Sequence, residues 1–445
     1  MLLLHVGIAV LIILFLIMKL ELNPAMSLII ASIYYGLATG LGFETTVSTI
    51  SNGFGNMMAG IGLSIGFGVM LGQLLASSGG IHSIANKLLD VFGEDNAAAA
   101  TAGTGFIGSI PVFYDVVYVI IIPIARGMSN LTGKTIALFV GALTAGALGT
   151  HMLVPPTPGP LALSEMLGID LGLMIIAGAI IGIILVSASI YIYKKFFLDR
   201  GFFNPETDID HEAVEEMEET DMQSKELPSF GASMFPIILP VILILIGTVT
   251  NVAMDTVPAF VTFLSDKVIA LLIGALTAYV VASAHLNKEQ VNKALSKAMS
   301  ASGLVLLITG AGGSFAAVLN QSGVANVIEG IVEGYSINIV LLAWLTAFIL
   351  RIAQGSGTVA MLTTGGLMAP VLSSGNVEAS ALWVAIAIGT GGLCLGHVND
   401  SGFWVTSKLS GLTTRGGLKT YTVMTGIMGI LGLIVSLLGS MIIPI

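Results

Sequence analysis

Two segments of the chain place hydroxyl and amide groups at breaks in otherwise apolar sequence. Gly108 to Pro123 and Gly355 to Pro370 both begin with Gly-Ser and end with Pro, and the second starts 247 residues after the first. In the first segment, Gly105 to Pro111 cannot run as an uninterrupted helix, because Pro111 removes an amide donor and the glycines loosen the backbone. The second segment repeats this break at Gln354 to Thr358. Interrupted backbone survives inside a membrane where it lines a cavity. We therefore expect two re-entrant hairpins with backbone amides free at their tips.

The tips carry groups that suit an oxygen-rich ligand. Hydroxyls and backbone amides at a helix start can bind a carboxylate or the hydroxyls of a polyol. The candidates are Ser109 in the first hairpin and Gly355, Ser356, Gly357 and Thr358 in the second. Arg351 lies four residues before Gly355, and its planar, always charged fork matches a carboxylate. Its partner is either the substrate or an acid of the chain, Asp400 or Asp115.

A second break follows each hairpin at a similar offset. Pro155 to Pro160 has four prolines in six residues and cannot be helical. Its counterpart, His397 to Trp404, contains an ionisable pair beside a glycine. We predict that Thr157, Asn399 and Ser401 donate hydrogen bonds to substrate from these unwound stretches. A simple loop at a helix end is the alternative for the proline stretch.

Four ionisable residues in these apolar regions are candidates for coupling transport to protons. A carboxylate at the bilayer centre costs at least ~2.5 to 3.5 kcal/mol, so Asp115 and Asp400 need a reason to be there. An acid in apolar surroundings can bind and release a proton near neutral pH. His151 and His397 occupy matched positions and can titrate in the same range. The alternatives are acids held by helix amides or by a cation, and histidines that only pack.

The composition is that of a membrane protein with many spans. Hydrophobic residues make up 55% and charged residues 9% of the 445 residues, and mean hydropathy is +0.98. Ten apolar runs approach the roughly 20 residues that a spanning helix needs. They lie at about 3 to 18, 24 to 42, 57 to 76, 135 to 154, 171 to 193, 235 to 253, 268 to 284, 300 to 319, 380 to 396 and 421 to 443. The sequence therefore predicts an all-α polytopic membrane protein that does not bind nucleic acid.

Several classes of function are disfavoured. The single cysteine, Cys394, excludes an intrachain disulfide and a cysteine metal cluster. No histidine, cysteine or glutamate spacing resembles a zinc site, and no Walker-type loop is present to couple ATP. We expect no cofactor and no metal, and we expect an ion gradient to supply the energy. A membrane enzyme or a passive channel is disfavoured, because neither a nucleophile–base pair nor a repeated pore ring is found.

The chain is predicted to consist of two inverted repeats. Each half, residues 1–198 and 229–445, would have about five crossings plus one re-entrant hairpin, and an odd number of crossings inverts the second half. An acidic linker at 199–228 joins them and is expected in the cytoplasm. Almost every lysine and arginine then lies inside, except Lys267 and Arg351. Both termini would face the periplasm or the exterior, and the substrate site would lie where interrupted helices meet.

The motifs PPTPGP, RIAQGSGTVA (Arg351 to Ala360) and GHVNDSGFW (Gly396 to Trp404) resemble the gluconate permease family of proton symporters. This family belongs to a wider ion transporter superfamily, and the resemblance covers essentially the whole chain. It implies a homodimeric elevator, with scaffold and hairpin-bearing transport domains, in the bacterial inner membrane. It also implies uptake of gluconate or a related sugar acid together with a proton.

Two departures at the expected site keep other substrates open. The resemblance implies a histidine where this chain has Thr157, and a second phenylalanine where it has Tyr114. Glycerate, a four-carbon sugar acid or D-serine are therefore alternatives to gluconate. Sodium coupling is a further alternative, since carbonyls exposed beside Asn399 and Asp400 could ligate that ion.

Overall fold

The fold is all-helical in the part of the chain that the structure describes. A computed structural model describes residues 2–20, 22–210, 227–254, 256–324, 338–374, 380–398 and 400–442. Within those ranges there is no strand, and the one β-type contact is an isolated bridge between Ile209 and Leu412. The predicted all-α class is confirmed.

Eight helical stretches among the described residues are long and apolar enough to cross a membrane. They are Phe43–Ser77, Tyr114–Thr132, Ile136–Leu167, Leu171–Arg200, Phe230–Asn251, Lys267–His285, Lys288–Gln321 and Thr414–Ile442. The ten predicted runs do not map onto them one to one. The runs near 3 to 18, 24 to 42 and 380 to 396 form helices of 17, 15 and 13 residues, which are shorter than these stretches.

Residues 2–210 contain fourteen described helical elements, of which η3 and α11 reach into the predicted linker. They are α1 (Leu2–Met18), α2 (Pro24–Ala38), α3 (Phe43–Met57), the π-helical η1 (Met58–Gly62), α4 (Leu63–Ser77), α5 (Gly80–Phe92), η2 (Glu94–Asn96), α6 (Ala97–Gly108), α7 (Tyr114–Thr132), α8 (Ile136–Leu153), α9 (Pro158–Leu167), α10 (Leu171–Phe196), η3 (Leu198–Arg200) and α11 (Pro205–Asp208). The α6–α7 pair is the segment expected to form the first hairpin.

The second half contains eleven described helical elements. They are α13 (Phe230–Ala253), α14 (Ala259–Ser265), α15 (Lys267–His285), α16 (Lys288–Gln321), α18 (Ile339–Gln354), α19 (Gly357–Ser373), α20 (Ala381–Leu393), α21 (Ser401–Leu409), α22 (Thr414–Gly417), the π-helical η4 (Leu418–Thr422) and α23 (Val423–Ile442). The pair α18–α19 has the place in this half that α6–α7 has in the first.

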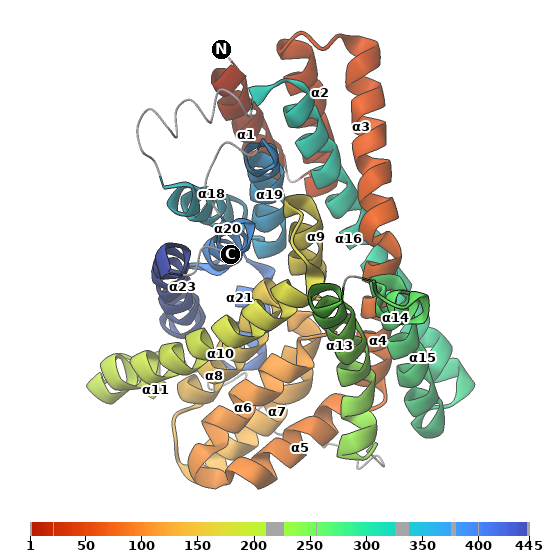
Figure 1. The fold of residues 1–445 in the computed structure, drawn as a ribbon. Coiled ribbons are helices and arrows are strands. Elements are labelled where there is room, and N and C mark those ends of the chain that lie inside the picture. Colours follow the sequence, from red (N-terminus) through yellow and green to blue (C-terminus); the bar gives the residue numbers. More distant parts are fainter. Residues whose placement is uncertain are drawn as a thin grey trace.

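The helices form two groups that meet at the centre of the molecule. The long helix α16 packs along α2, α3 and α4, and these elements run down one side of the view in Figure 1. The hairpin helices pack on the helices that follow them, α6 on α8 and α18 on α20, and these lie on the other side. The broken ends of the hairpin helices thereby come together beside α16.

Local sequence decides where the central helices stop. Helix α18 ends at Gln354 because Gly355 adopts a left-handed conformation, with φ of 81°, and its N–H bonds to the carbonyl of Arg351. Ser356 then caps α19, with its Oγ 3.3 Å from the amide of Val359. In the first half, α8 ends at Leu153, just before the proline stretch. Helices α18 and α8 therefore end where the sequence predicts interruptions. The expectation that Pro155 to Pro160 is entirely non-helical is wrong, because Pro158, Gly159 and Pro160 form the first turn of α9, where proline fits and a free amide is not needed.

The first hairpin tip lies directly against α4. A Cβ at Gly72 would be 2.0 Å from the carbonyl oxygen of Pro111, so no larger residue fits at this position. This approach brings the start of α7 next to α4 and to the central cavity described below.

Candidate functional site

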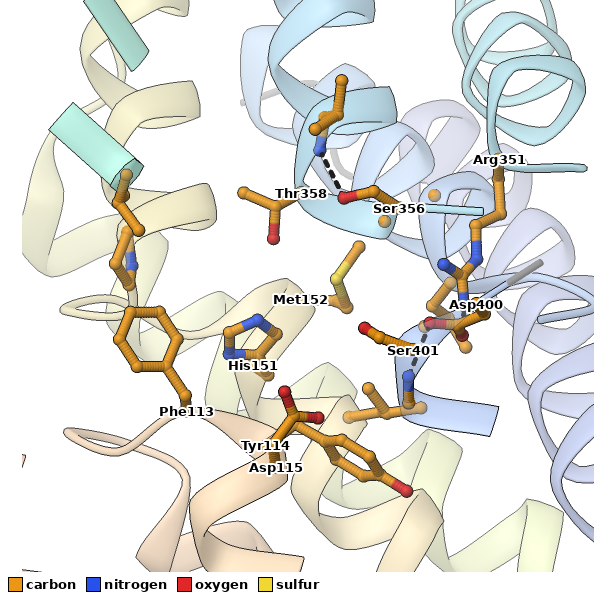
Figure 2. A pocket seen from close by; sticks show the side chains of 18 of the residues that line it. Phe113, Tyr114, Asp115, His151, Met152, Arg351, Ser356, Thr358, Asp400 and Ser401 are labelled. Atoms are coloured by element: carbon orange, nitrogen blue, oxygen red, sulfur yellow. Dashed lines mark hydrogen bonds and ion pairs between the residues drawn. The ribbon is translucent and has the colours of Figure 1, made fainter. Parts of the chain in front are cut away.

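A cavity of about 270 Å³ lies where the two hairpins, the two breaks and α16 meet. Figure 2 shows Asp115 and His151 on one side of it and Ser356 and Thr358 on the other. The lining residues are Phe113, Tyr114, Asp115, Leu148, His151, Met152, Pro158, Leu304, Val305, Ile308, Arg351, Ser356, Gly357, Thr358, Val359, Leu362, Gly392, Leu393, Asp400, Ser401, Gly402 and Tyr421. The volume is just below the ~300–1,000 Å³ of sites for drug-sized ligands, which suits a small metabolite.

Four helix N-termini line this cavity. They are the first turns of α7, α9, α19 and α21, which are the second arms of the hairpins and the second pieces of the broken helices. Each helix start carries about half a positive charge from its unpaired amides. Asp115 lies in the first turn of α7 and Asp400 caps α21, so two of the four ends already face an acid. Pro158 and Pro160 remove two of the first three amides of α9, so the start of α19 is the end left for an anionic ligand.

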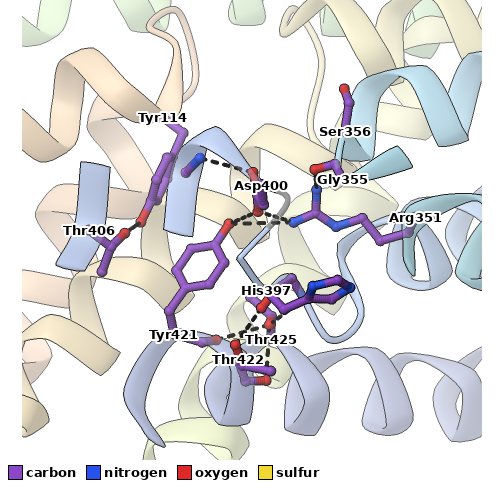
Figure 3. Close-up of polar contacts among 12 residues, drawn as sticks. Tyr114, Arg351, Gly355, Ser356, His397, Asp400, Thr406, Tyr421, Thr422 and Thr425 are labelled. Atoms are coloured by element: carbon purple, nitrogen blue, oxygen red, sulfur yellow. Dashed lines mark hydrogen bonds and ion pairs between the residues drawn. The ribbon is translucent and has the colours of Figure 1, made fainter. Parts of the chain in front are cut away.

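Asp400 is fully engaged by donors from three elements. Figure 3 shows Arg351 Nη2 in a buried ion pair with Asp400 Oδ2, which also accepts the Tyr421 hydroxyl at 2.5 Å. The other carboxylate oxygen accepts the Gly402 amide at 2.9 Å. Only 4% of Arg351 and 6% of Asp400 is exposed, so this pair is a desolvated unit held by hydrogen bonds.

The same unit fixes the second break against the last helices. Arg351 Nη1 donates to the carbonyl of Gly355, which ties the second tip to the ion pair. The backbone of Gly396 is held by Thr422 and Thr425, whose Oγ1 atoms lie 2.6 and 3.1 Å from its carbonyl and amide. A Cβ at Gly396 would be 2.4 Å from Arg351 Nη2, so this position must be glycine.

Asp115 has the opposite character. Its side chain is exposed to the cavity and, among the described residues, makes no hydrogen bond or ion pair. His151 lines the same cavity, and its Nδ1 is buried without a hydrogen-bond partner in the described structure. The ring of His151 packs at 6.0 Å from that of Phe113. This side of the cavity therefore holds a carboxyl group and an imidazole nitrogen that make no hydrogen bond among the described residues.

The two matched histidines differ in position. His151 faces the cavity, whereas His397 is not among its lining residues and its Nε2 lies 3.2 Å from the carbonyl of Ile352. The two histidines occupy matched positions in the sequence, but this did not determine the direction in which each imidazole ring points. Among the proposed proton groups, His397 is thus remote from the ligand space.

The other predicted binding residues divide into two sets. Ser356, Gly357, Thr358 and Ser401 line the cavity, and Gly355 accepts from Arg351 behind it. Thr157 lies in an adjoining cleft, where its Oγ1 donates to the carbonyl of Val154 at 2.6 Å.

Ser109 is not among the residues that line the cavity. Ser109 is buried, and its hydroxyl has no partner among the described residues. Asn399 lies outside the described residues.

Three features of the site were not anticipated from the sequence. Tyr421 completes the ion pair, although it stands at the start of an apolar run and belongs to the π-helical turn η4. Tyr114 bonds across to Thr406 and so joins the first hairpin to α21. Helix α16 supplies an apolar wall through Leu304, Val305 and Ile308. The sequence does carry one signal for these contacts: a tyrosine within an apolar membrane segment usually places its hydroxyl against a buried polar partner.

With this geometry established, comparison with known proteins identifies the family. The family model described as GntP family permease matches residues 1–442. The chain belongs to this family of permeases. A gluconate permease of Bacillus subtilis (strain 168) is 34% identical over 440 residues, covering 96% of this chain and 97% of the relative. The high-affinity gluconate transporter of Escherichia coli (strain K12) is 32% identical and covers 98% of this chain and 99% of its own length.

The fold is also that of a solved membrane transporter. The YdaH transporter of Alcanivorax borkumensis superposes with a TM-score of 0.65 over 94% of this chain and 97% of its own, at 16% identity. At that identity the likeness establishes the fold alone. This permease family member is therefore a multi-pass membrane protein with a transporter fold.

Proposed function

We propose that this protein is a proton-coupled symporter that imports gluconate or a related sugar acid. The observation that carries the proposal is the pairing of a free acid, Asp115, with a closed ion pair, Arg351–Asp400, in one cavity. The relatives named as gluconate permease and gluconate transporter support the substrate class.

Charge balance in the cavity favours proton coupling. Arg351 and Asp400 neutralise each other, which leaves the charge of Asp115. An ionised Asp115 would repel the carboxylate of a sugar acid across a low-dielectric space. Protonating Asp115 removes this repulsion, so substrate and proton bind more favourably together than alone. That mutual preference is the thermodynamic basis of symport.

The substrate carboxylate is proposed to bind at the second hairpin tip. The start of α19 offers the amides of Gly357 and Thr358, and the Nε of Arg351 has no partner among the described residues. Ser356, Thr358 and Ser401 would supply hydrogen bonds to the hydroxyls of the substrate. The other candidates for such bonds are Asn399, Thr157 and Ser109. For proton coupling, Asp115 is the first candidate and His151 the second. His397 and Asp400 rank below these two.

Protons are preferred over sodium as the coupling ion because of what surrounds Asp400. Both of its oxygens accept hydrogen bonds from Arg351, Tyr421 and the amide of Gly402. A sodium site needs those oxygens free to face the ion. Sodium dependence at fixed pH is the result that would reverse this preference.

The architecture that we propose for transport follows from the matched helix order. Residues 1–198 and 229–445 form two inverted repeats around the cytoplasmic linker 199–228, with both termini periplasmic or extracellular. Helices α3, α4 and α16 would belong to the scaffold of an elevator, and the hairpins and broken helices to its moving domain. A homodimer in the bacterial inner membrane completes this proposal.

Uptake into proteoliposomes tests the function directly. An inward proton gradient should drive accumulation of radiolabelled gluconate, and a protonophore should abolish it. A panel of glycerate, a four-carbon sugar acid and D-serine as competitors then ranks the alternative substrates. A substrate flux that does not depend on the imposed pH gradient would contradict proton coupling. If a shorter acid competes more strongly than unlabelled gluconate, that acid is the preferred substrate.

A further inference from the structure

A second cavity, of about 300 Å³, lies on the other side of Asp115. Its lining comes from three helices: Gln73, Ala76 and Ser77 of α4, Val116, Val119 and Ile120 of α7, and Lys297 of α16. Asp115 belongs to the lining of both this cavity and the substrate cavity. One exposed carboxyl group is thus accessible from two separate spaces.

The second cavity has the polar lining that a water path needs. Gln73 Nε2 donates to the hydroxyl of Ser77 at 3.1 Å, one turn further along α4, and Lys297 is exposed across from them. A space of this size with several polar partners holds water, whose share of volume is about 30 Å³ per molecule. The remaining lining is apolar, so nothing else in it competes for a proton.

The cationic residues around this cavity indicate which side of the membrane it faces. Lys297 follows Lys288 and Lys293 along the first turns of α16, just after the turn that joins α15 to α16. Clusters of lysine next to membrane helices mark the cytoplasmic side. The second cavity therefore lies toward the cytoplasm from Asp115.

We infer that the second cavity is the path by which Asp115 releases its proton to the cytoplasm, separate from the route of the substrate. The inference rests on the proposed function. Asp115 takes up a proton when the substrate cavity opens outward, and its O–H bond later breaks toward water in the second cavity. Lys297 is the only other charged side chain in the described lining of this cavity.

Different charged and titratable groups face Asp115 from the two cavities. On the substrate side Asp115 shares the lining with His151 of α8, Arg351 of α18 and Asp400 at the start of α21. On the other side α16 contributes Lys297, whereas α4 contributes the neutral Gln73 and Ser77. The cation that faces Asp115 from the cytoplasmic cavity is therefore Lys297, because Arg351 is already paired with Asp400.

A cysteine placed in the second cavity tests this path. Val119 is 52% exposed and lines the cavity, so Val119→Cys in a Cys394→Ser background should fold and transport normally. Leu131→Cys, 73% exposed near the end of the same helix and outside both linings, is the matched control. Each variant is treated with sulfonatoethyl methanethiosulfonate, and modification is verified by mass spectrometry.

Two transport modes then separate proton release from substrate movement. Net uptake driven by a pH gradient requires the proton to leave, whereas exchange of internal for external substrate does not. We expect modification of the Val119→Cys variant to lower net uptake at least tenfold and to leave exchange within twofold. Modification of the Leu131→Cys variant should change neither mode.

Four results would overturn the inference. The first is unchanged net uptake after complete modification of the Val119→Cys variant. The second is a loss of exchange as large as the loss of net uptake, which would mean that the cavity belongs to the substrate route. A third is a thiol in that variant that the reagent cannot reach from the cytoplasmic side, because a water path must be accessible. An unmodified protein without pH-driven uptake would instead refute the proposed function, and this inference with it.

Discussion

The two acids of the central cavity occupy opposite environments, although each lies at the N-terminus of a helix that follows a break. Asp400 is buried and accepts hydrogen bonds from Arg351, Tyr421 and Gly402. Asp115 is exposed and makes no such contact among the described residues. Both oxygens of Asp400 are thus occupied by donors, whereas the carboxyl group of Asp115 faces the cavity without a hydrogen bond. Under the proposed function, Asp400 in the second half anchors the site and Asp115 in the first half couples transport to protons.

The largest expected effect comes from breaking the anchored side. Arg351→Gln leaves the carboxylate of Asp400 buried and unpaired, which costs about 3–5 kcal/mol for a pair of this kind. We expect a strong loss of thermal stability in detergent and no measurable substrate binding. The double variant Arg351→Gln with Asp400→Asn should recover most of the stability and none of the binding. Equal stability of the single and double variants would contradict the role of the ion pair.

A smaller effect should follow from crowding that pair. Gly396→Ala puts a methyl group within 2.4 Å of Arg351 Nη2, and relieving such overlap costs about 1–3 kcal/mol. Transport should fall because Arg351 must move away from the second tip. Gly303, where a Cβ meets nothing within 4 Å, is the matched control, and Gly303→Ala should leave transport intact. Normal transport by Gly396→Ala would show that the position of Arg351 is not critical.

Removing one donor from Asp400 should have an effect of similar size. Tyr421→Phe deletes the 2.5 Å hydrogen bond to Asp400 while keeping the ring, at a cost of about 1.5–3 kcal/mol for a bond to a charged group. We expect weaker substrate binding but an unchanged ratio of protons to substrate, measured by proton flux during uptake. A changed ratio of protons to substrate would mean that Asp400 takes part in proton coupling and does not only anchor the site.

A third acid, Asp208, is the control for burial and pairing away from the cavity. It is buried, with Lys419 Nζ at 2.7 Å and Arg415 Nε at 3.3 Å. Burial tends to raise the pKa of Asp208, but hydrogen bonds from Lys419 and the Asn204 amide outweigh it and hold the pKa below its usual range. Its stabilisation is therefore complete above about pH 3.9, the unfolded value, and is lost as the pH falls through the lower folded value.

The variant Asp208→Asn should accordingly have the smallest effect on transport. We expect net uptake at neutral pH within twofold of the unmodified protein. The thermal stability should be lower and should lose its dependence on acid pH, which thermal unfolding between pH 3 and 7 measures. A loss of proton coupling in this variant would show that burial and ion pairing do not separate structural acids from the coupling acid.

The sequence predicted the breaks well because they arise from local chemistry. Proline at 155 and 156 ends α8, and the glycine at 355 ends α18, whatever the rest of the molecule does. It could not decide whether Arg351 would bind substrate, Asp115 or Asp400, because that depends on how α18 and α21 pack together. The direction of His151 and His397, and the contact of Tyr421, depend on packing in the same way.

The most direct test of the account is the proton flux that accompanies substrate entry in Asp115→Asn, compared with Asp115→Glu. In proteoliposomes at equal internal and external pH, a substrate gradient should drive protons inward with the unmodified protein and with Asp115→Glu. Asp115→Asn should still exchange substrate, but substrate entry should carry no protons. If Asp115→Asn moves protons with substrate as the unmodified protein does, Asp115 is not the coupling acid and the contrast with Asp400 has another meaning.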